Sequence, residues 1–165
     1  MRLDFPDRTY NRYTSSCAYS FEIPEYFIMV DKEACNKDVV IDRFNAKLFL
    51  TYIPVDTNLA MDIEYSRKLV YDHSIKADEI QEALVQFPQN KVYGMKYNIV
   101  GNAASPYQFY VTDSLHHFVR GALYFNVAPN YDSLKPSLEY VVEDIDHMIE
   151  TVHWGAENEH SSIEE

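Results

Sequence analysis

Residues 91–152, KVYGMKYNIVGNAASPYQFYVTDSLHHFVRGALYFNVAPNYDSLKPSLEYVVEDIDHMIETV, contain three strand-like runs and one helix-like run with few residues between them. The strand-like runs are residues 91–100, 107–112 and 116–127, which are rich in the aromatic and β-branched side chains that favour strands. Residues 113–116 suit a tight hairpin, and consecutive strands joined by so short a link must be antiparallel. This order predicts an antiparallel sheet followed by a carboxy-terminal helix.

The predicted carboxy-terminal helix follows a turn at residues 129–133, where Asp132 or Ser133 can cap its free N–H groups. Its apolar residues recur at intervals of three and four and share one stripe: Leu138, Val141, Val142, Ile145, Met148, Ile149 and Val152. The face that we expect to be exposed to water carries Glu139, Glu143, Asp144, Asp146 and Glu150. The pattern predicts a long amphipathic helix that covers one face of the sheet.

The amino-terminal half predicts further strands and a second helix. Its strand-like runs are residues 19–23, 39–41 and 46–53, the last two as a pair. Asn58 is a candidate cap for a helix over residues 59–73. Residues 78–87 fit a helix or a strand, and we favour a strand because the following turn would make a hairpin with residue 91 onward. Together these elements predict an α+β fold, an antiparallel sheet flanked by helices.

Length and charge limit the possible functions. With 165 residues, 47% of them hydrophobic, the chain is large enough for one globular domain. We place this domain at residues 1–154, before an acidic tail at residues 155–165 that we predict to be disordered. The formal net charge of −12 disfavours binding to nucleic acid and to anionic membranes. No apolar run approaches the ~20 residues that a membrane-spanning helix needs.

Candidate catalytic and metal-binding residues form no convincing constellation. Asp113, His116 and His117 invite a metal interpretation, but adjacent strand residues point to opposite faces, so both histidines cannot readily bind one ion. The sequence contains no nucleophile elbow, and its four glycines are too scattered for a phosphate loop. We therefore predict no enzyme, cofactor or metal site, and keep a small-ligand or metal-binding module that uses the tyrosine-rich sheet as the alternative.

Two local features stay open on the residues alone. Cys17 and Cys35, the only cysteines, either form a disulfide, which neighbouring strands would allow, or are two unpaired small apolar residues. The run GNAAS at residues 101–105 either forms a turn or brings the backbone close to a ligand, and we favour the turn.

Several short segments are distinctive in wording and occur in order along nearly the whole chain. They are RLDFP at residues 2–6, CAYSFEIP at 17–24, SIKAD at 74–78, KVYG at 91–94, GNAAS at 101–105, TDS at 112–114, FVRGALYFN at 118–126, PN at 129–130, DSL at 132–134 and DI at 144–145. In these segments the chain resembles the gliding motility lipoprotein GldD family of Bacteroidetes envelopes. The order of the predicted elements also resembles the PsbP-like fold, an α/β/α sandwich.

The GldD resemblance implies a non-catalytic, periplasm-facing envelope domain that supports gliding motility and type IX secretion through protein–protein contacts. It implies a lipid anchor on a cysteine upstream of Met1, and an oxidising compartment that favours a bond between Cys17 and Cys35. We expect the partners to be other envelope proteins of that machinery. The predicted contact residues are Asn102, Ser105, Asp113, His116, His117, Arg120 and Asn126.

Overall fold

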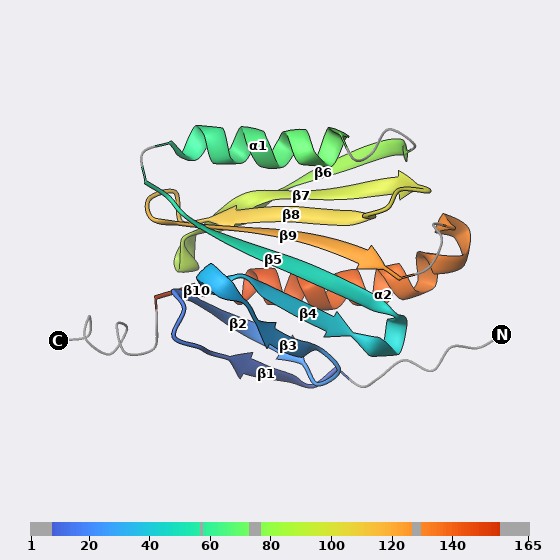
Figure 1. Cartoon of the computed structure of the whole chain (residues 1–165), viewed down its shortest axis with the longest axis horizontal. Coiled ribbons are helices and arrows are strands. Elements are labelled where there is room, and N and C mark those ends of the chain that lie inside the picture. The colour runs from blue at the N-terminus through green and yellow to red at the C-terminus, as the bar shows by residue number, and fades with distance from the viewer. Residues whose placement is uncertain (1–7, 57, 73–76, 127–129, 156–165) are drawn as a thin grey trace.

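The computed structural model describes residues 8–56, 58–72, 77–126 and 130–155. Within them the chain forms two antiparallel sheets and two α-helices (Figure 1). The predicted mixture of helices with antiparallel strands is therefore confirmed, and so is the presence of a carboxy-terminal helix.

A seven-stranded sheet forms the centre of the molecule, and all its neighbouring strands are antiparallel. In sequence order its strands are β3 (Ile28–Asp31), β4 (Lys37–Ile41), β5 (Ala46–Pro54), β6 (Ala77–Phe87), β7 (Val92–Gly101), β8 (Tyr107–Thr112) and β9 (His117–Phe125). Their order across the sheet is β3-β4-β5-β9-β8-β7-β6. The predicted pairing of the β4 and β5 regions is confirmed, and the ambiguous segment is the strand β6, in a hairpin with β7.

The turn between β8 and β9 explains why β9 begins at His117 and not at the predicted His116. Asp113 Oδ1 accepts hydrogen bonds from the backbone N–H groups of Leu115, His116 and His117, at 2.8–3.0 Å. His116 is therefore part of the turn. The predicted end of this strand at residue 127 lies outside the described residues, and β9 ends at Phe125.

A second, three-stranded sheet brings segments from the two ends of the described chain together. Its order is β1 (Tyr10–Tyr13), β2 (Tyr19–Pro24) and β10 (His153–Trp154), with β2 in the middle. Short 3-10 helices occur at η1 (Glu33–Cys35), η2 (Asp42–Phe44) and η3 (Pro88–Asn90). Of the three strands in this sheet, the sequence predicted only β2.

The two α-helices pack on opposite faces of the seven-stranded sheet. α1 (Leu59–Asp72) contributes Val70 to a core with Tyr97 and Phe118. α2 (Tyr131–Glu150) and the small sheet pack on the other face, in a larger core. Neighbouring residues along β9 alternate between these cores, since Phe118 lies in the first and Val119 in the second.

The caps of the two helices differ in how well they were predicted. Asn58 Oδ1 accepts a hydrogen bond from the Met61 N–H at 3.2 Å, so the predicted cap of α1 is confirmed. The predicted cap of α2 at Asp132 or Ser133 is wrong. Asn130 caps this helix by accepting a hydrogen bond from the Ser133 N–H, because α2 already begins at Tyr131.

Candidate interaction surface

The face of the seven-stranded sheet that carries α1 is only partly covered. α1 lies along the end of the sheet formed by β6, β7 and β8, and Ile53 near the end of β5 packs in the same core, whereas β3 and β4 are free of helix on this side (Figure 1). Ile28, Val30 and Phe49 expose 50%, 40% and 39% of their surface. Their strand neighbours Met29, Leu48 and Leu50 belong to the α2-side core, so these three residues point to the α1 side.

The strand register places these apolar side chains in two adjacent rows. The first row crosses four strands: Ile28 lies opposite Val40, Val40 opposite Lys47, and Lys47 opposite Tyr124. In the next row Val30 lies opposite Asp38, Asp38 opposite Phe49, and Phe49 opposite Ala122. We call Ile28, Val30, Val40, Phe49 and Tyr124 the open face.

Phe49 is the centre of the open face. Its ring packs edge-on against the ring of Tyr124 at 5.5 Å, and Lys47 Nζ lies 5.9 Å from its centroid. A hollow of about 370 Å³ on one side of Phe49 is lined partly by Val40, Tyr124 and Asn126. A second hollow of about 480 Å³ on the other side is lined partly by Lys32, Asn36 and Thr51. Exposed apolar side chains flanked by polar hollows are typical of protein contact sites.

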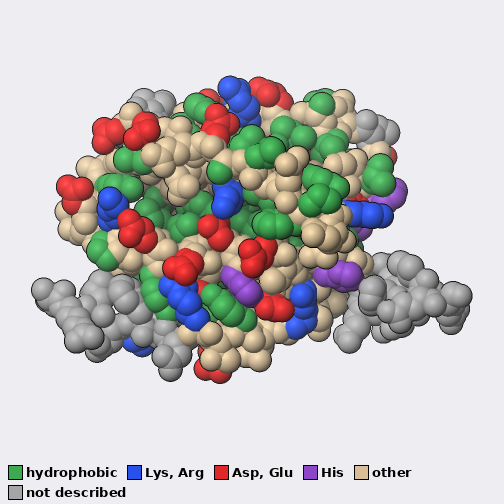
Figure 2. Space-filling view, turned by 180° about the vertical axis from the view of Figure 1, so that it is seen from behind, with side chains coloured by type: hydrophobic (Ala, Val, Ile, Leu, Met, Phe, Trp, Pro, Cys, Tyr) green, Lys and Arg blue, Asp and Glu red, His purple; other side chains and the backbone are tan. Residues whose placement is uncertain are grey.

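The sheet face behind the open face is different, because α2 and the small sheet cover it. Seen from behind, the surface intersperses acidic, basic and histidine side chains among hydrophobic ones (Figure 2). Asp144, which we predicted to face water on α2, is fully buried, so that prediction is wrong. Its Oδ1 accepts hydrogen bonds from Arg8 at 2.8 Å and Tyr10 at 2.5 Å, and its Oδ2 accepts one from Tyr26.

The predicted contact residues do not form one surface. Asn126 borders the open face, where its carbonyl accepts a hydrogen bond from Asn45. Arg120 lies on the same side of the sheet, since it follows Val119 of the opposite core. Burial lowers the pKa of Arg120, although the nearby phenols act in the opposite direction.

Asn102 and Ser105 have local structural roles. Asn102 Oδ1 accepts a hydrogen bond from the Tyr131 N–H at 2.8 Å, which fixes the start of α2. Ser105 is buried and donates to the Leu123 carbonyl at 2.8 Å. Gly101 has a φ of 112°, and the Ala103 N–H donates to its carbonyl at 3.0 Å. These bonds support the interpretation of residues 101–105 as a turn.

Asp113 and the two histidines lie at the turn between β8 and β9. Burial disfavours the charged form of Asp113, but the three backbone N–H donors outweigh it and lower the pKa of this carboxyl. His117 is stacked on Trp154 at 5.4 Å, and its Nδ1 shares a hydrogen bond of 2.6 Å with Tyr52. In the described part of the chain, no cluster of three or more His, Cys, Asp or Glu side chains is suited to a metal ion.

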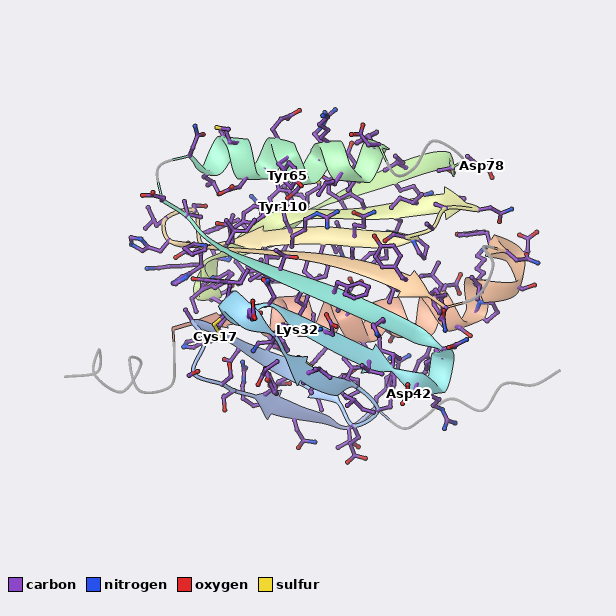
Figure 3. The ribbon with its side chains drawn as sticks, viewed as in Figure 1. Cys17, Lys32, Asp42, Tyr65, Asp78 and Tyr110 are labelled. Atoms are coloured by element: carbon purple, nitrogen blue, oxygen red, sulfur yellow. A yellow bond between two sulfur atoms is a disulfide. The ribbon has the colours of Figure 1, made fainter. Side chains whose placement is uncertain are left out.

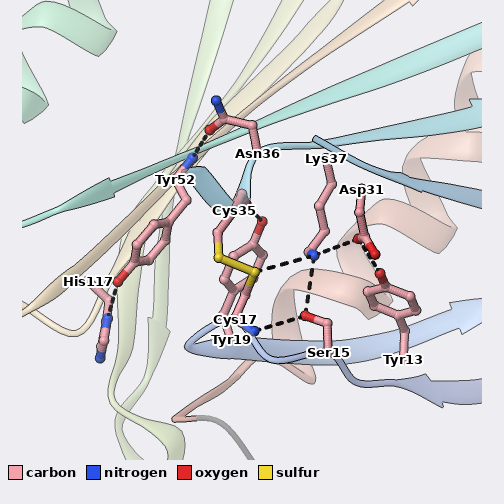
Figure 4. The surroundings of a disulfide bond; sticks show 10 residues. All are labelled: Tyr13, Ser15, Cys17, Tyr19, Asp31, Cys35, Asn36, Lys37, Tyr52 and His117. Atoms are coloured by element: carbon pink, nitrogen blue, oxygen red, sulfur yellow. Dashed lines mark hydrogen bonds and ion pairs between the residues drawn. A yellow bond between two sulfur atoms is a disulfide. The ribbon is translucent and has the colours of Figure 1, made fainter. Parts of the chain in front are cut away.

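Cys17 and Cys35 form a disulfide with a Cα–Cα distance of 5.7 Å (Figure 4). Cys17 precedes β2 and Cys35 ends η1 before β4, and β2 and β4 are not neighbours but lie in different sheets. The bond therefore connects the small sheet to the large one.

The disulfide lies beside a buried cation. Lys37 is 1% exposed, and its Nζ lies 2.9 Å from Asp31 Oδ1 and 3.8 Å from Cys17 Sγ (Figure 4). Tyr13 also donates to Asp31, and these two hydrogen bonds lower the pKa of this carboxyl. The surroundings of the disulfide are thus internally paired and serve to hold the sheets together.

An α/β domain whose sheets are joined by a disulfide is typical of proteins that fold in an oxidising compartment, such as the cell envelope. Within that class, the chain belongs to the gliding motility lipoprotein GldD family, whose model matches residues 1–154. The resemblance predicted from the sequence is therefore confirmed. No curated protein matches the chain.

Membership of this family implies involvement in gliding motility and suggests an envelope-associated protein with a lipid anchor. The family is one of motility lipoproteins and is not a known enzyme family. Neither described helix combines the length and the apolar character needed to cross a bilayer.

Proposed function

We propose that this domain is a non-catalytic, periplasm-facing interaction module that supports assembly of the gliding and type IX secretion machinery. Its partner is another envelope protein of that machinery, which packs on the open face. We also propose that its fold is PsbP-like with an amphipathic α2, an analogy of architecture that carries no function by itself.

The observation that supports this function most directly is the open face. Three large apolar side chains, Ile28 and Val30 on β3 and Phe49 on β5, are 39–50% exposed on the part of the sheet that α1 leaves uncovered, with only β4 between the two strands. Single exposed apolar residues are common on soluble domains, but a contiguous group next to an uncovered sheet indicates a contact surface. The aromatic pair Phe49 and Tyr124 offers the type of anchor that contributes most to protein binding.

Capture from envelope extracts tests this proposal. The tagged full-length protein is cross-linked in a gliding host, purified and compared with its Phe49→Ser variant. We expect the wild-type protein to recover motility or secretion components, and the variant to recover at least about tenfold less, as for an interface anchor. Recovery of none of these components by the wild-type protein would count against the function.

A matched control separates the open face from exposed apolar surface in general. Leu115 is 64% exposed at the turn between β8 and β9, away from the open face. The Leu115→Ser variant should recover the same partners as the wild-type protein. Equal losses in both variants, or none in Phe49→Ser, would exclude the open face as the contact site. Unchanged melting temperatures show that the variants are folded.

A further inference from the structure

The layer between α1 and the sheet contains a half-buried cation without an acidic partner among the described residues. Arg120 of β9 is partly buried, and its Nη2 donates a hydrogen bond to Gln108 Oε1 of β8. Among the described residues, no carboxylate forms an ion pair with Arg120. A charge taken out of water without a counter-charge is costly, and structures usually compensate it with a pair or a ligand.

The two buried side-chain atoms that lack a hydrogen-bond partner within the described chain belong to this same layer. They are Gln108 Nε2 and Ser66 Oγ. Gln108 is 1% exposed, and Ser66 lies on the buried side of α1. Since a guanidinium group only donates, Gln108 must direct its oxygen at Arg120, which leaves its NH₂ group free to bind an acceptor. An unsatisfied buried donor beside an unpaired cation indicates a missing acceptor.

The register defines what surrounds these donors. Ala122 of β9 lies directly opposite Gln108 on one side and Phe49 on the other. Burial lowers the pKa of Arg120, and Tyr124 and Tyr65 lie close enough to it to act in the opposite direction. Tyr65 projects from α1 in the region above the strands (Figure 3). The donors are thus bordered by aromatic side chains at the boundary between α1 and the open face.

We infer that Arg120 and Gln108 form a binding site for a carboxylate, carried either by a free organic acid or by a peptide. The acceptor oxygens would bind Arg120 and Gln108 Nε2, and the aromatic residues would contact the apolar part of the ligand. A carboxylate fits better than a phosphate because the site offers one full positive charge and otherwise neutral donors. This site does not depend on whether the open face binds a protein.

Titrations followed by NMR test the site directly. The side-chain resonances of Arg120 Nε and Gln108 Nε2 are recorded with sodium acetate, benzoate or inorganic phosphate, at constant ionic strength. We expect saturable shifts with acetate and benzoate, with dissociation constants on the order of 1–10 mM. No saturable shift with either carboxylate, or tighter binding of phosphate, would overturn the inference.

The two sources of the carboxylate are separated by a peptide arm. A short peptide with a free carboxy terminus is compared with the same peptide amidated at that end. Tighter binding of the free peptide than of benzoate identifies a peptide ligand. Tighter binding of benzoate identifies a small acid, and both results support the site. Equal binding of the free and amidated peptides, without carboxylate-dependent shifts, would contradict it.

Three variants make the test independent of simple unfolding. Arg120→Met should abolish acetate binding, whereas Lys47→Met, which removes a cation from the same sheet face, should retain it. Gln108→Glu should supply the missing counter-charge, so it should raise the melting temperature by a few degrees and also abolish acetate binding. A lower melting temperature for Gln108→Glu, or equal losses in Arg120→Met and Lys47→Met, would show that Arg120 needs no anion.

Discussion

At the scale of single residues, the buried carboxylate of Asp144 is the feature that sequence periodicity misassigned. Its helical position places it among acids that we expected to face water. Its carboxylate accepts hydrogen bonds from three side chains of the amino-terminal segment: Arg8, Tyr10 and Tyr26. No local pattern in α2 reports partners more than a hundred residues away in the chain. A buried acid on an otherwise exposed helical face can be recognised only once its tertiary partners are known.

The Asp144→Asn substitution should destabilise the domain by about 2–3 kcal/mol, because it removes a buried charge that three partly buried donors share. Urea unfolding of both proteins measures this difference. Glu143→Gln is the matched control, since Glu143 pairs with the same Arg8 at 3.0 Å but is mostly exposed. It should change stability by less than about 0.5 kcal/mol. Equal effects of the two substitutions would contradict the assigned role of Asp144.

The tyrosines predict a loss of stability at high pH. Burial raises the pKa of Tyr10, Tyr13 and Tyr97 to about 12 from an ordinary value of 10.0. The folded state therefore favours protonated phenols, so their contribution is complete below pH 10 and is lost between pH 10 and 12. Each such group reduces the free energy of unfolding by up to about 1.4 kcal/mol per pH unit in this window.

Urea unfolding at pH 9, 10 and 11 measures this dependence. The Tyr97→Phe variant, which keeps the ring and removes the titrating group, should lose stability less steeply above pH 10. Tyr97 is the best position because it is 97% buried by its neighbours, with only 3% exposed. Parallel profiles for the variant and the wild-type protein would show that Tyr97 does not titrate in this range.

At the scale of elements, the disulfide compensates for limited pairing between the two sheets. β2 pairs with β1 and β10, and none of these three strands pairs with β4. Replacing both Cys17 and Cys35 by Ala should lower the free energy of unfolding by about 3 kcal/mol, because the bond closes a loop with a sequence separation of 18. Reductant should destabilise the wild-type protein equally and leave the variant unchanged. A reductant effect on the variant would point to another cause.

The elements that were predictable are those with enough residues to show a period. β7 and α1 are long enough for alternation or a helical stripe to appear, whereas β6 was ambiguous by its pattern and was assigned from the turn that joins it to β7. β1 and β3 have four residues each and β10 has two, so tertiary partners define them more than local sequence does. The same limit applies to the candidate sites. The sequence nominated Arg120, but only the structure shows that Gln108 accepts a hydrogen bond from it.

At the scale of the whole molecule, the small sheet joins the two ends of the described chain. β2 pairs with β1 on one edge and with β10 on the other. Trp154 of β10 donates to the Lys91 carbonyl at 2.8 Å, and the Gly155 N–H donates to the Ala18 carbonyl at 2.8 Å. The chain after α2 is therefore a structural part of the domain, which agrees with the family match ending at residue 154.

Two shortened chains test this role of β10. A chain that ends at Thr151 loses Val152, which is buried in the large core, and Trp154, which stacks on His117. We expect it to lose at least about 3 kcal/mol of stability, since a buried valine and a packed indole are both removed. This corresponds to a melting temperature lower by roughly 6–12 °C.

A chain that ends at Gly155 keeps β10, and its melting temperature should stay within about 2 °C of the full chain. Calorimetry on the three proteins decides between the alternatives. If the Gly155 chain melts as early as the Thr151 chain, the residues beyond 155 stabilise the domain and our prediction of a separate tail is wrong.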